Sequence, residues 1–257
     1  MVLSQQRKDN IKDVIKKSLR SKLQNYKPQS NEMPFHFRLL GRDRMALFSF
    51  IQSLNTTFGT SIFEPIAIAL ASPRFAKVTA QYVVGSTIFD NCQRQVTNII
   101  NGLTINPKSD KANELILLKS ALSGKTNKLK PAKVDLFLET AEGEQYLFDL
   151  KTAKPNKGDF QKYKQTLLEW AGIAYTKDKN AKVNTLIAIP YNPYEPQPYQ
   201  RWTMAGMLDL QNELMVADDF WDFLGGVGTY QELLECFEQA GIELRPEMDT
   251  YFARFTQ

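Results

Sequence analysis

Two aspartates and a lysine in the middle of the chain are the residues whose types and spacing best suit chemistry. Asp135 is separated by thirteen residues from the triplet Asp149-Leu150-Lys151, and both groups lie in short apolar stretches. Carboxylate oxygens suit Mg²⁺, which proteins usually hold with one or two carboxylates while phosphates supply further oxygens. A neighbouring lysine can orient a water molecule and neutralise charge as the phosphate is attacked. The pattern therefore favours metal-dependent cleavage of a phosphodiester, and a nucleic acid as the substrate.

Whether the two aspartates meet depends on the turn between their strands. Side chains alternate between the two faces of a strand, so Asp149 and Lys151 share one face, but a one-residue slip would move Asp135 to the other. A two-residue turn would separate the carboxylates, whereas a three-residue loop at 141–143 would place them directly opposite each other. Such a loop usually carries a left-handed residue at its third position, which glycine adopts without steric cost. Gly143 stands there, so the sequence predicts the three-residue loop.

The segments around this hairpin predict an α/β fold. After it, residues 159–175 place apolar side chains on one helical face, and residues 183–189 form a continuous apolar run typical of a buried strand. A crossover of this length implies that the last strand lies parallel to the strand of Asp149, which gives a mixed sheet flanked by helices. Earlier patterns predict an amphipathic helix at 5–24 and two apolar helices broken at Gly59 and Pro73. Residues 75–89 fit either a strand or a helix, and their β-branched side chains favour the strand.

Length and charge suggest one domain with three parts. The chain has 257 residues, 43% of them hydrophobic, enough to bury a core. We expect a single domain at 1–257, with a helical N-terminal part at about 1–75, a catalytic core at about 76–204 and an acidic helical C-terminal part at about 205–257. Residues 1–50 hold 11 Lys and Arg against 4 Asp and Glu, whereas residues 205–257 hold 2 against 11. The basic body suits a polyanion and the acidic part should point away from it, although a basic helix is often only a solvated face.

Other features exclude several classes of protein. No stretch approaches 18 uninterrupted apolar residues and the N-terminus lacks the apolar core of a signal peptide, so a cytoplasmic protein is expected. The single histidine, His36, gives little support for histidine-based nucleases or zinc proteases, and its apolar neighbours predict a structural role. Cys92 and Cys236 lack metal-ligand spacing, so we expect buried, reduced thiols.

These residues resemble the PD-(D/E)XK nuclease superfamily, whose restriction-endonuclease-like core is a mixed sheet with metal ligands on a hairpin. Asp149-Leu150-Lys151 matches the second half of the motif and Asp135 the first aspartate, although Val134 stands in place of proline. The stretches DLKTAKPNKGDFQKYKQTLLEW and IPYNPYEPQPYQRW look like Type II restriction endonucleases, and among these the TdeIII-like group.

The resemblance implies a function in some detail. It implies Mg²⁺-dependent cleavage of double-stranded DNA at a short, palindromic site by a homodimer with one active site for each strand. Asp135 and Asp149 become metal ligands, with the Leu150 carbonyl as a third, and Lys151 becomes the residue that positions the attacking water. The alternative for these three side chains is a salt bridge on a surface hairpin.

Four further residues are candidates for the site. Many relatives in the superfamily add a glutamate from a helix before the hairpin, and Glu64 is the best match, but Ser61 and Glu64 also form a capping-box pattern. Lys154, Lys157 and Arg201 are candidate DNA contacts. The alternative for the two lysines is a solvated loop, and the alternative for Arg201 is an extended strap packed on the core.

Two other functions remain open at this point. A repair or recombination nuclease of the same superfamily would shorten DNA continuously instead of giving discrete fragments. A DNA-binding module with a vestigial nuclease site would bind DNA without metal and would not cut it.

Overall fold

The chain folds into two compact units. The computed structural model describes residues 2–28, 33–151, 159–199, 204 and 206–255. One unit combines Met1–Ala69 with Gly225–Gln257, and the other holds Leu70–Leu224. The basic N-terminal and acidic C-terminal segments of the sequence are therefore parts of the same unit.

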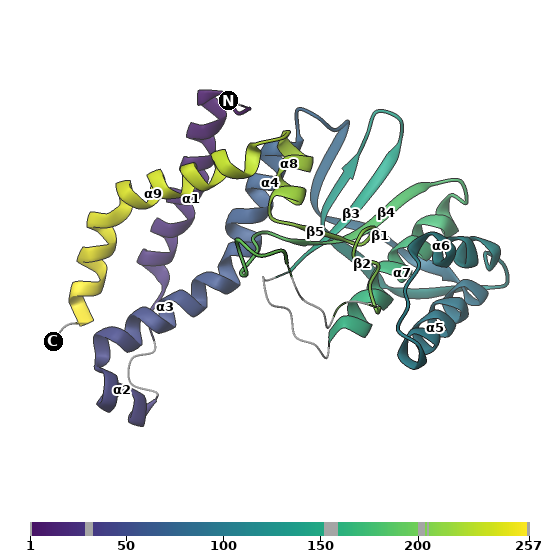
Figure 1. Cartoon of the computed structure of the whole chain (residues 1–257), viewed down its shortest axis with the longest axis horizontal. Coiled ribbons are helices and arrows are strands. Elements are labelled where there is room, and N and C mark those ends of the chain that lie inside the picture. The colour runs from purple at the N-terminus through teal and green to yellow at the C-terminus, as the bar shows by residue number, and fades with distance from the viewer. Residues whose placement is uncertain (1, 29–32, 152–158, 200–203, 205, 256–257) are drawn as a thin grey trace. The chain divides into compact units, whose positions relative to one another are not determined.

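Ion pairs join the first and last long helices of the first unit. Its elements are α1 (Gln5–Asn25), α2 (Pro34–Leu40), α3 (Arg42–Phe58), the π-helical turn η1 (Gly59–Phe63), α4 (Glu64–Ala71), α9 (Thr229–Phe252) and η4 (Ala253–Phe255). Helix α9 packs along α1 (Figure 1). Lys16 pairs with Glu243 at 2.8 Å, and Arg20 pairs with Glu247 at 2.7 Å. The acidic C-terminal helix thus neutralises part of the charge of the basic first helix, which leaves less of that charge for a polyanion.

The expected break at Gly59 is wrong. Gly59 has right-handed helical dihedral angles, and α3 continues through η1 into α4. A π-helical turn inserts one extra residue and lets a helix continue past a poor helix former; such turns are frequent at functional sites. Ser61 lies inside this turn and not at a helix start, so the capping-box interpretation of Ser61 and Glu64 is also wrong.

The second unit is built on one mixed sheet, as predicted. Its strands are β1 (Lys77–Phe89), β2 (Thr126–Glu139), β3 (Glu144–Leu150), β4 (Lys182–Ile189) and β5 (Leu214–Val216), and they lie in the order β1-β2-β3-β4-β5. The pairs β1–β2 and β2–β3 are antiparallel, whereas β3–β4 and β4–β5 are parallel. The helices of this unit are α5 (Asp90–Ile105), α6 (Lys111–Ser120), α7 (Phe160–Lys177) and α8 (Asp218–Gly225) (Figure 1). The predicted α/β class, the strand at 75–89 and the parallel return strand are confirmed.

Helices α7 and α8 pack against the sheet. Phe148 on β3 contacts Phe220 and Phe223 of α8, with ring centroids 5.4 and 6.0 Å apart. Helix α7, the crossover between β3 and β4, packs against β1 and β4. Since side chains alternate along a strand, Asp149 points to the face opposite Phe148, away from α8.

Strand β2 begins earlier than the sequence suggests. Residues 125–133 look like a basic loop before the hairpin, but β2 starts at Thr126 and includes Pro131. Proline cannot donate to a β-ladder and is tolerated at edges and bulges. The β1–β2 register shifts twice between Val83 and Thr87, opposite this stretch, and the pairing with β3 starts only at Leu136. Pro131 therefore sits in an irregular stretch that is paired on one side.

The cysteines lie as predicted, and the histidine does not. Cys92 and Cys236 are buried and unpaired, and burial raises the pKa of the Cys92 thiol to about 11. His36 is exposed on α2, so the structural role that its apolar sequence neighbours predict is not supported. Among the described residues, no helix combines the length and the apolar content that a membrane crossing requires.

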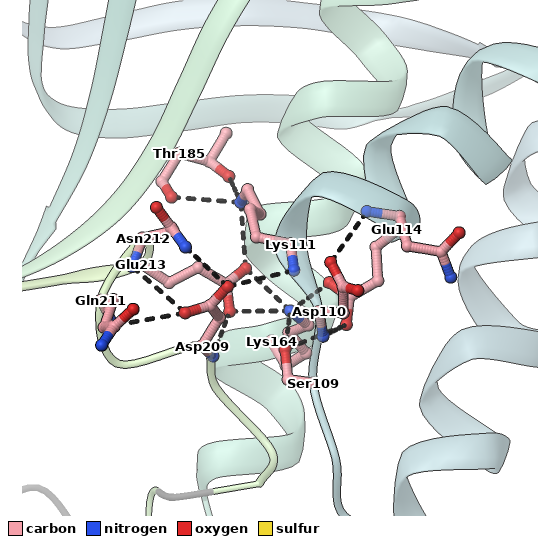
Figure 2. A network of polar contacts seen from close by, with 11 residues as sticks. Ser109, Asp110, Lys111, Glu114, Lys164, Thr185, Asp209, Gln211, Asn212 and Glu213 are labelled. Carbon is pink, nitrogen blue, oxygen red and sulfur yellow. Dashed lines mark hydrogen bonds and ion pairs between the residues drawn. The ribbon is translucent and has the colours of Figure 1, made fainter.

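A buried cluster of charges joins the helices of the second unit to the sheet (Figure 2). Lys164 of α7 and Glu213, just before β5, are 0% exposed and pair at 2.7 Å. Glu213 also accepts from Lys111 at the start of α6, at 2.9 Å, and Lys164 pairs with Glu114. Lys111 in turn donates to the carbonyl oxygen of Thr185 on β4 at 3.2 Å. Two lysines and two glutamates thus balance one another where α6, α7 and the sheet meet, and burial lowers the pKa of Lys111.

Candidate active site

The hairpin that carries the candidate site turns through three residues. The Thr140 N–H donates to the Glu144 carbonyl at 2.9 Å, and the Gly143 N–H donates to the Thr140 carbonyl at 3.0 Å. Gly143 has φ of +77°, the left-handed conformation that the third loop position requires. Apart from its two chain neighbours, no described residue has an atom within 4 Å of the place where a Cβ would be, so backbone conformation, and not crowding, is what favours glycine here. The predicted three-residue loop is confirmed.

This loop sets Asp135 opposite Asp149. The ladder ends where Leu136 pairs with Phe148, and the same register continued by one residue sets Asp135 across from Asp149. The two carboxyl groups interact, because Asp135 contributes to the raised pKa of Asp149. The Leu150 N–H donates to Asp135 Oδ2 at 2.8 Å, so the first carboxylate is fixed to the backbone between Asp149 and Lys151. The register that a shared site requires is therefore present.

Burial gives the second carboxylate an unusual electrostatic setting. Asp149 is 13% exposed and pairs with Lys151, 26% exposed, at 2.7 Å. Desolvation raises the pKa of Asp149 to about 6; Lys151 opposes this shift, while the nearby Asp135 adds to it. An ion pair is thus present, as the salt-bridge alternative predicts. That alternative gives no reason for a second, like-charged carboxylate to face a mostly buried pair.

The donor set fits a hard divalent cation. Asp135 and Asp149 offer carboxylate oxygens, and two like charges held close together at low solvent exposure carry a free-energy cost that a bound cation would offset. In the part of the chain that the structure describes, no three His, Cys, Asp or Glu side chains gather as a metal-binding group. Mg²⁺ usually keeps several waters and takes phosphate oxygens, so two carboxylates suffice for such a site.

Helix α7 holds the lysine of the site. The Lys151 N–H donates to the Ala188 carbonyl of β4 at 2.9 Å, which fixes the backbone. The Lys151 Nζ lies 4.8 Å from the centre of the Tyr163 ring, within the range of a cation–π contact. The amine is therefore held between a carboxylate and an aromatic face. The sequence places Tyr163 on the packed face of this helix, but nothing in it assigns the ring to Lys151.

Glu64 lies in the helical unit, whereas the hairpin lies in the sheet unit. It is the first residue of α4 and is 6% exposed. Buried carboxylates are uncommon in proteins. Its part in catalysis stays a prediction.

The three candidate DNA contacts lie outside the described residues. Lys154 and Lys157 fall in 152–158, and Arg201 falls in 200–203. A residue that the sequence does not single out is Gln81, whose Nε2 donates to Asp135 Oδ1 at 3.4 Å. No motif or spacing marks it, because its contact arises from pairing between β1 and β2.

Comparison with known proteins identifies the family. The family described as "Type II restriction endonuclease, HinfI" matches residues 3–241. Type II restriction enzyme HgiCII from Herpetosiphon aurantiacus is 25% identical over 221 residues, which cover 84% of this chain and 80% of the relative. HgiBI from the same organism is 25% identical over 222 residues, with 84% and 79% covered. Type II restriction enzyme MjaII from Methanocaldococcus jannaschii is 26% identical over 203 residues, 74% of this chain and 54% of the relative.

These matches confirm part of the expected resemblance. The family match spans the hairpin as well as most of both units, and the relatives agree on Type II restriction enzymes. They do not confirm the TdeIII-like group or the PD-(D/E)XK superfamily by name. The chain belongs to the HinfI family of Type II restriction endonucleases.

Proposed function

We propose that the protein hydrolyses phosphodiester bonds of double-stranded DNA at a short, palindromic site, and that it requires Mg²⁺. The observation that carries the proposal is the hairpin register of the three-residue loop, which brings Asp135 near Asp149, with Lys151 paired to Asp149. Family membership supports site-specific cleavage of DNA. The same hairpin geometry supports the PD-(D/E)XK assignment.

Each side chain of the site has a separate role in the proposed reaction. Asp135 and Asp149 would hold Mg²⁺, which when bound supplies a positive charge that polarises the phosphate and favours ionisation of water. Lys151 donates to the attacking water, orients it toward phosphorus, and stabilises the negative charge that develops on the phosphate oxygens. The Tyr163 ring lies 4.8 Å from the Lys151 Nζ and would keep the amine near this position if Asp149 held the cation instead. Glu64 is proposed as a further carboxylate of the reaction, and Lys154, Lys157 and Arg201 as contacts to DNA.

Metal removal tests the proposal directly. Purified protein is incubated with phage or plasmid DNA in Mg²⁺, and in parallel with excess chelator. We expect discrete fragments in Mg²⁺ and none with chelator, and fragment ends that map to one palindrome. Continuous shortening would favour an exonuclease, and binding without cuts in either condition would favour a vestigial site.

We also propose that two copies act together on the two DNA strands. Each chain carries one such hairpin in its described part, and a duplex presents two strands related by two-fold symmetry. Helices α2 and α3 expose several large apolar side chains, which is typical of a surface that another molecule covers. Phe35 is 84% and Leu39 83% exposed, and they lie one helical turn apart; Leu47, Phe48 and Ile51 of α3 are also exposed. A second copy of the chain is the occupant that a two-fold symmetric DNA site favours.

Charged substitutions on α2 test this pairing. Phe35→Glu with Leu39→Glu is expected to convert a dimer to a monomer in analytical ultracentrifugation and to replace double-strand cleavage by nicking. Ile105→Glu on α5 is the matched control, because Ile105 is 87% exposed in the other unit and should leave the dimer intact. A wild-type monomer, or a dimer that survives both α2 substitutions, would contradict this surface as the interface.

A further inference from the structure

Gln81 of β1 has a backbone conformation that is unusual for its residue type. Its φ is +51°, in the left-handed region that side chains with a Cβ rarely adopt. Its neighbours keep the regular ladder, with Ala80 paired to Leu136 and Tyr82 paired to Val134. The distortion is therefore confined to the one residue that stands opposite Asp135. Strained backbone of this kind persists where the surroundings enforce it, and it concentrates at functional sites.

The side chain of Gln81 completes the fixing of the first carboxylate. Asp135 Oδ2 accepts from the Leu150 N–H at 2.8 Å, on the β3 side. Asp135 Oδ1 faces the Gln81 Nε2 at 3.4 Å, on the β1 side. The carboxylate thus has a donor from each neighbouring strand, and rotation about its Cβ–Cγ bond would lengthen both hydrogen bonds.

An amide suits this position for a chemical reason. It donates a hydrogen bond without bringing a positive charge, so it orients the carboxylate and does not compete with a cation for it, as a lysine would. Glycine would adopt the left-handed backbone at no cost, but it would leave Asp135 Oδ1 without this donor. Glutamine therefore provides the hydrogen-bond donor that glycine lacks, although its backbone conformation is unfavourable.

We propose that Gln81 is a positioning residue that orients Asp135 for the divalent cation. The inference rests on the proposed metal site of Asp135 and Asp149 and adds to it a third strand, β1. Gln81 acts through Asp135, so its replacement should lower the affinity for the metal more than it lowers the stability of the fold. Loss of a hydrogen-bond partner of a metal ligand typically weakens metal binding or activity by about 10- to 100-fold.

The test compares two substitutions at this position. Gln81→Gly removes the side chain and relieves the backbone, and Gln81→Ala removes the side chain and keeps the strain. Binding of Mn²⁺ alone to the protein is measured by the electron paramagnetic resonance of the free ion, and the Mg²⁺ concentration for half-maximal cleavage is measured in parallel. We expect both variants to weaken Mn²⁺ binding and to raise that Mg²⁺ concentration by about 10-fold or more. The melting temperature of Gln81→Gly should equal or exceed that of the wild type.

A control at Gln145 and a variant of the metal site, Asp149→Ala, distinguish failure of the positioning role from failure of the metal site. Gln145 makes the same kind of contact in the same hairpin, donating to Glu139 at 3.1 Å, and Gln145→Ala should leave metal dependence unchanged. If Asp149→Ala loses Mn²⁺ and cleavage but Gln81→Gly keeps both, the positioning role is wrong and the metal site stands. If Asp149→Ala binds Mn²⁺ and cuts as the wild type does, the metal site itself is wrong. Weaker binding that accompanies a lower melting temperature in both Gln81 variants would also overturn the positioning role.

Discussion

Asp149→Ala is expected to lower the rate of DNA cleavage by about 1,000-fold or more, and Lys151→Ala by about 100-fold or more, because each change removes a group that stabilises the transition state directly or through the cation. Single-turnover cleavage of a plasmid at saturating protein measures both effects. Glu142→Ala, in the exposed turn of the same hairpin, is the matched control and should cut as the wild type does.

Measurements of stability and of DNA binding show whether a loss of cleavage arises in the chemical step or from unfolding or weaker binding. The folded-state pKa of Asp149 is raised to about 6, so its ionised form costs folding free energy above that pH, and the cost disappears as the pH falls toward the ordinary value of 3.8. In chelator at about pH 8, Asp149→Ala should therefore melt no lower than the wild type. It should also bind DNA at least as tightly, because it removes a negative charge that faces phosphate. A variant that cuts normally, or that loses cleavage only because it has unfolded, would contradict the assigned role.

The core of the site could be predicted from the sequence because its determinants are local. Strand periodicity places Asp149 and Lys151 on one face, and the turn between the strands decides the position of Asp135. Gly143 allows the loop that joins them, and only residues 140–143 separate β2 from β3. The parallel return strand follows in the same way from the length of the crossover and the apolar run.

Features that depend on distant pairing could not be predicted. The left-handed Gln81 meets Asp135 only because β1 and β2, 54 residues apart at this point, share a ladder. The sequence suggests a break at Gly59 because glycine is a poor helix former. No residue pattern in the sequence marks the π-helical turn that continues the helix past it. The sequence predicts an acidic C-terminal segment that points away from a polyanion, but net charge does not reveal that its last helix packs along the basic first helix. In each case the deciding interaction joins segments that sequence patterns describe one at a time.

The buried charges around Lys164 and Glu213 are expected to have the largest effect on stability (Figure 2). Lys164→Met removes one of two positive charges and leaves Glu114 without its cation in a buried cluster. Breaking a buried pair in this way typically costs about 3–5 kcal/mol in the free energy of unfolding. Urea unfolding followed by the fluorescence of Trp170 and Trp221, both buried in this unit, measures the change.

The size of that effect should depend on charge balance more than on how many of the cluster's side chains are replaced. Lys164→Met combined with Glu114→Gln removes one charge of each sign and leaves Lys111 paired with Glu213 at 2.9 Å. The double variant should therefore be more stable than Lys164→Met, although two members of the cluster have been changed. Arg94→Met breaks an exposed pair with Asp90 on α5 and should cost less than about 1 kcal/mol. If the double variant is less stable than Lys164→Met, or if Lys164→Met costs no more than Arg94→Met, then packing and not charge compensation holds α6 and α7 to the sheet.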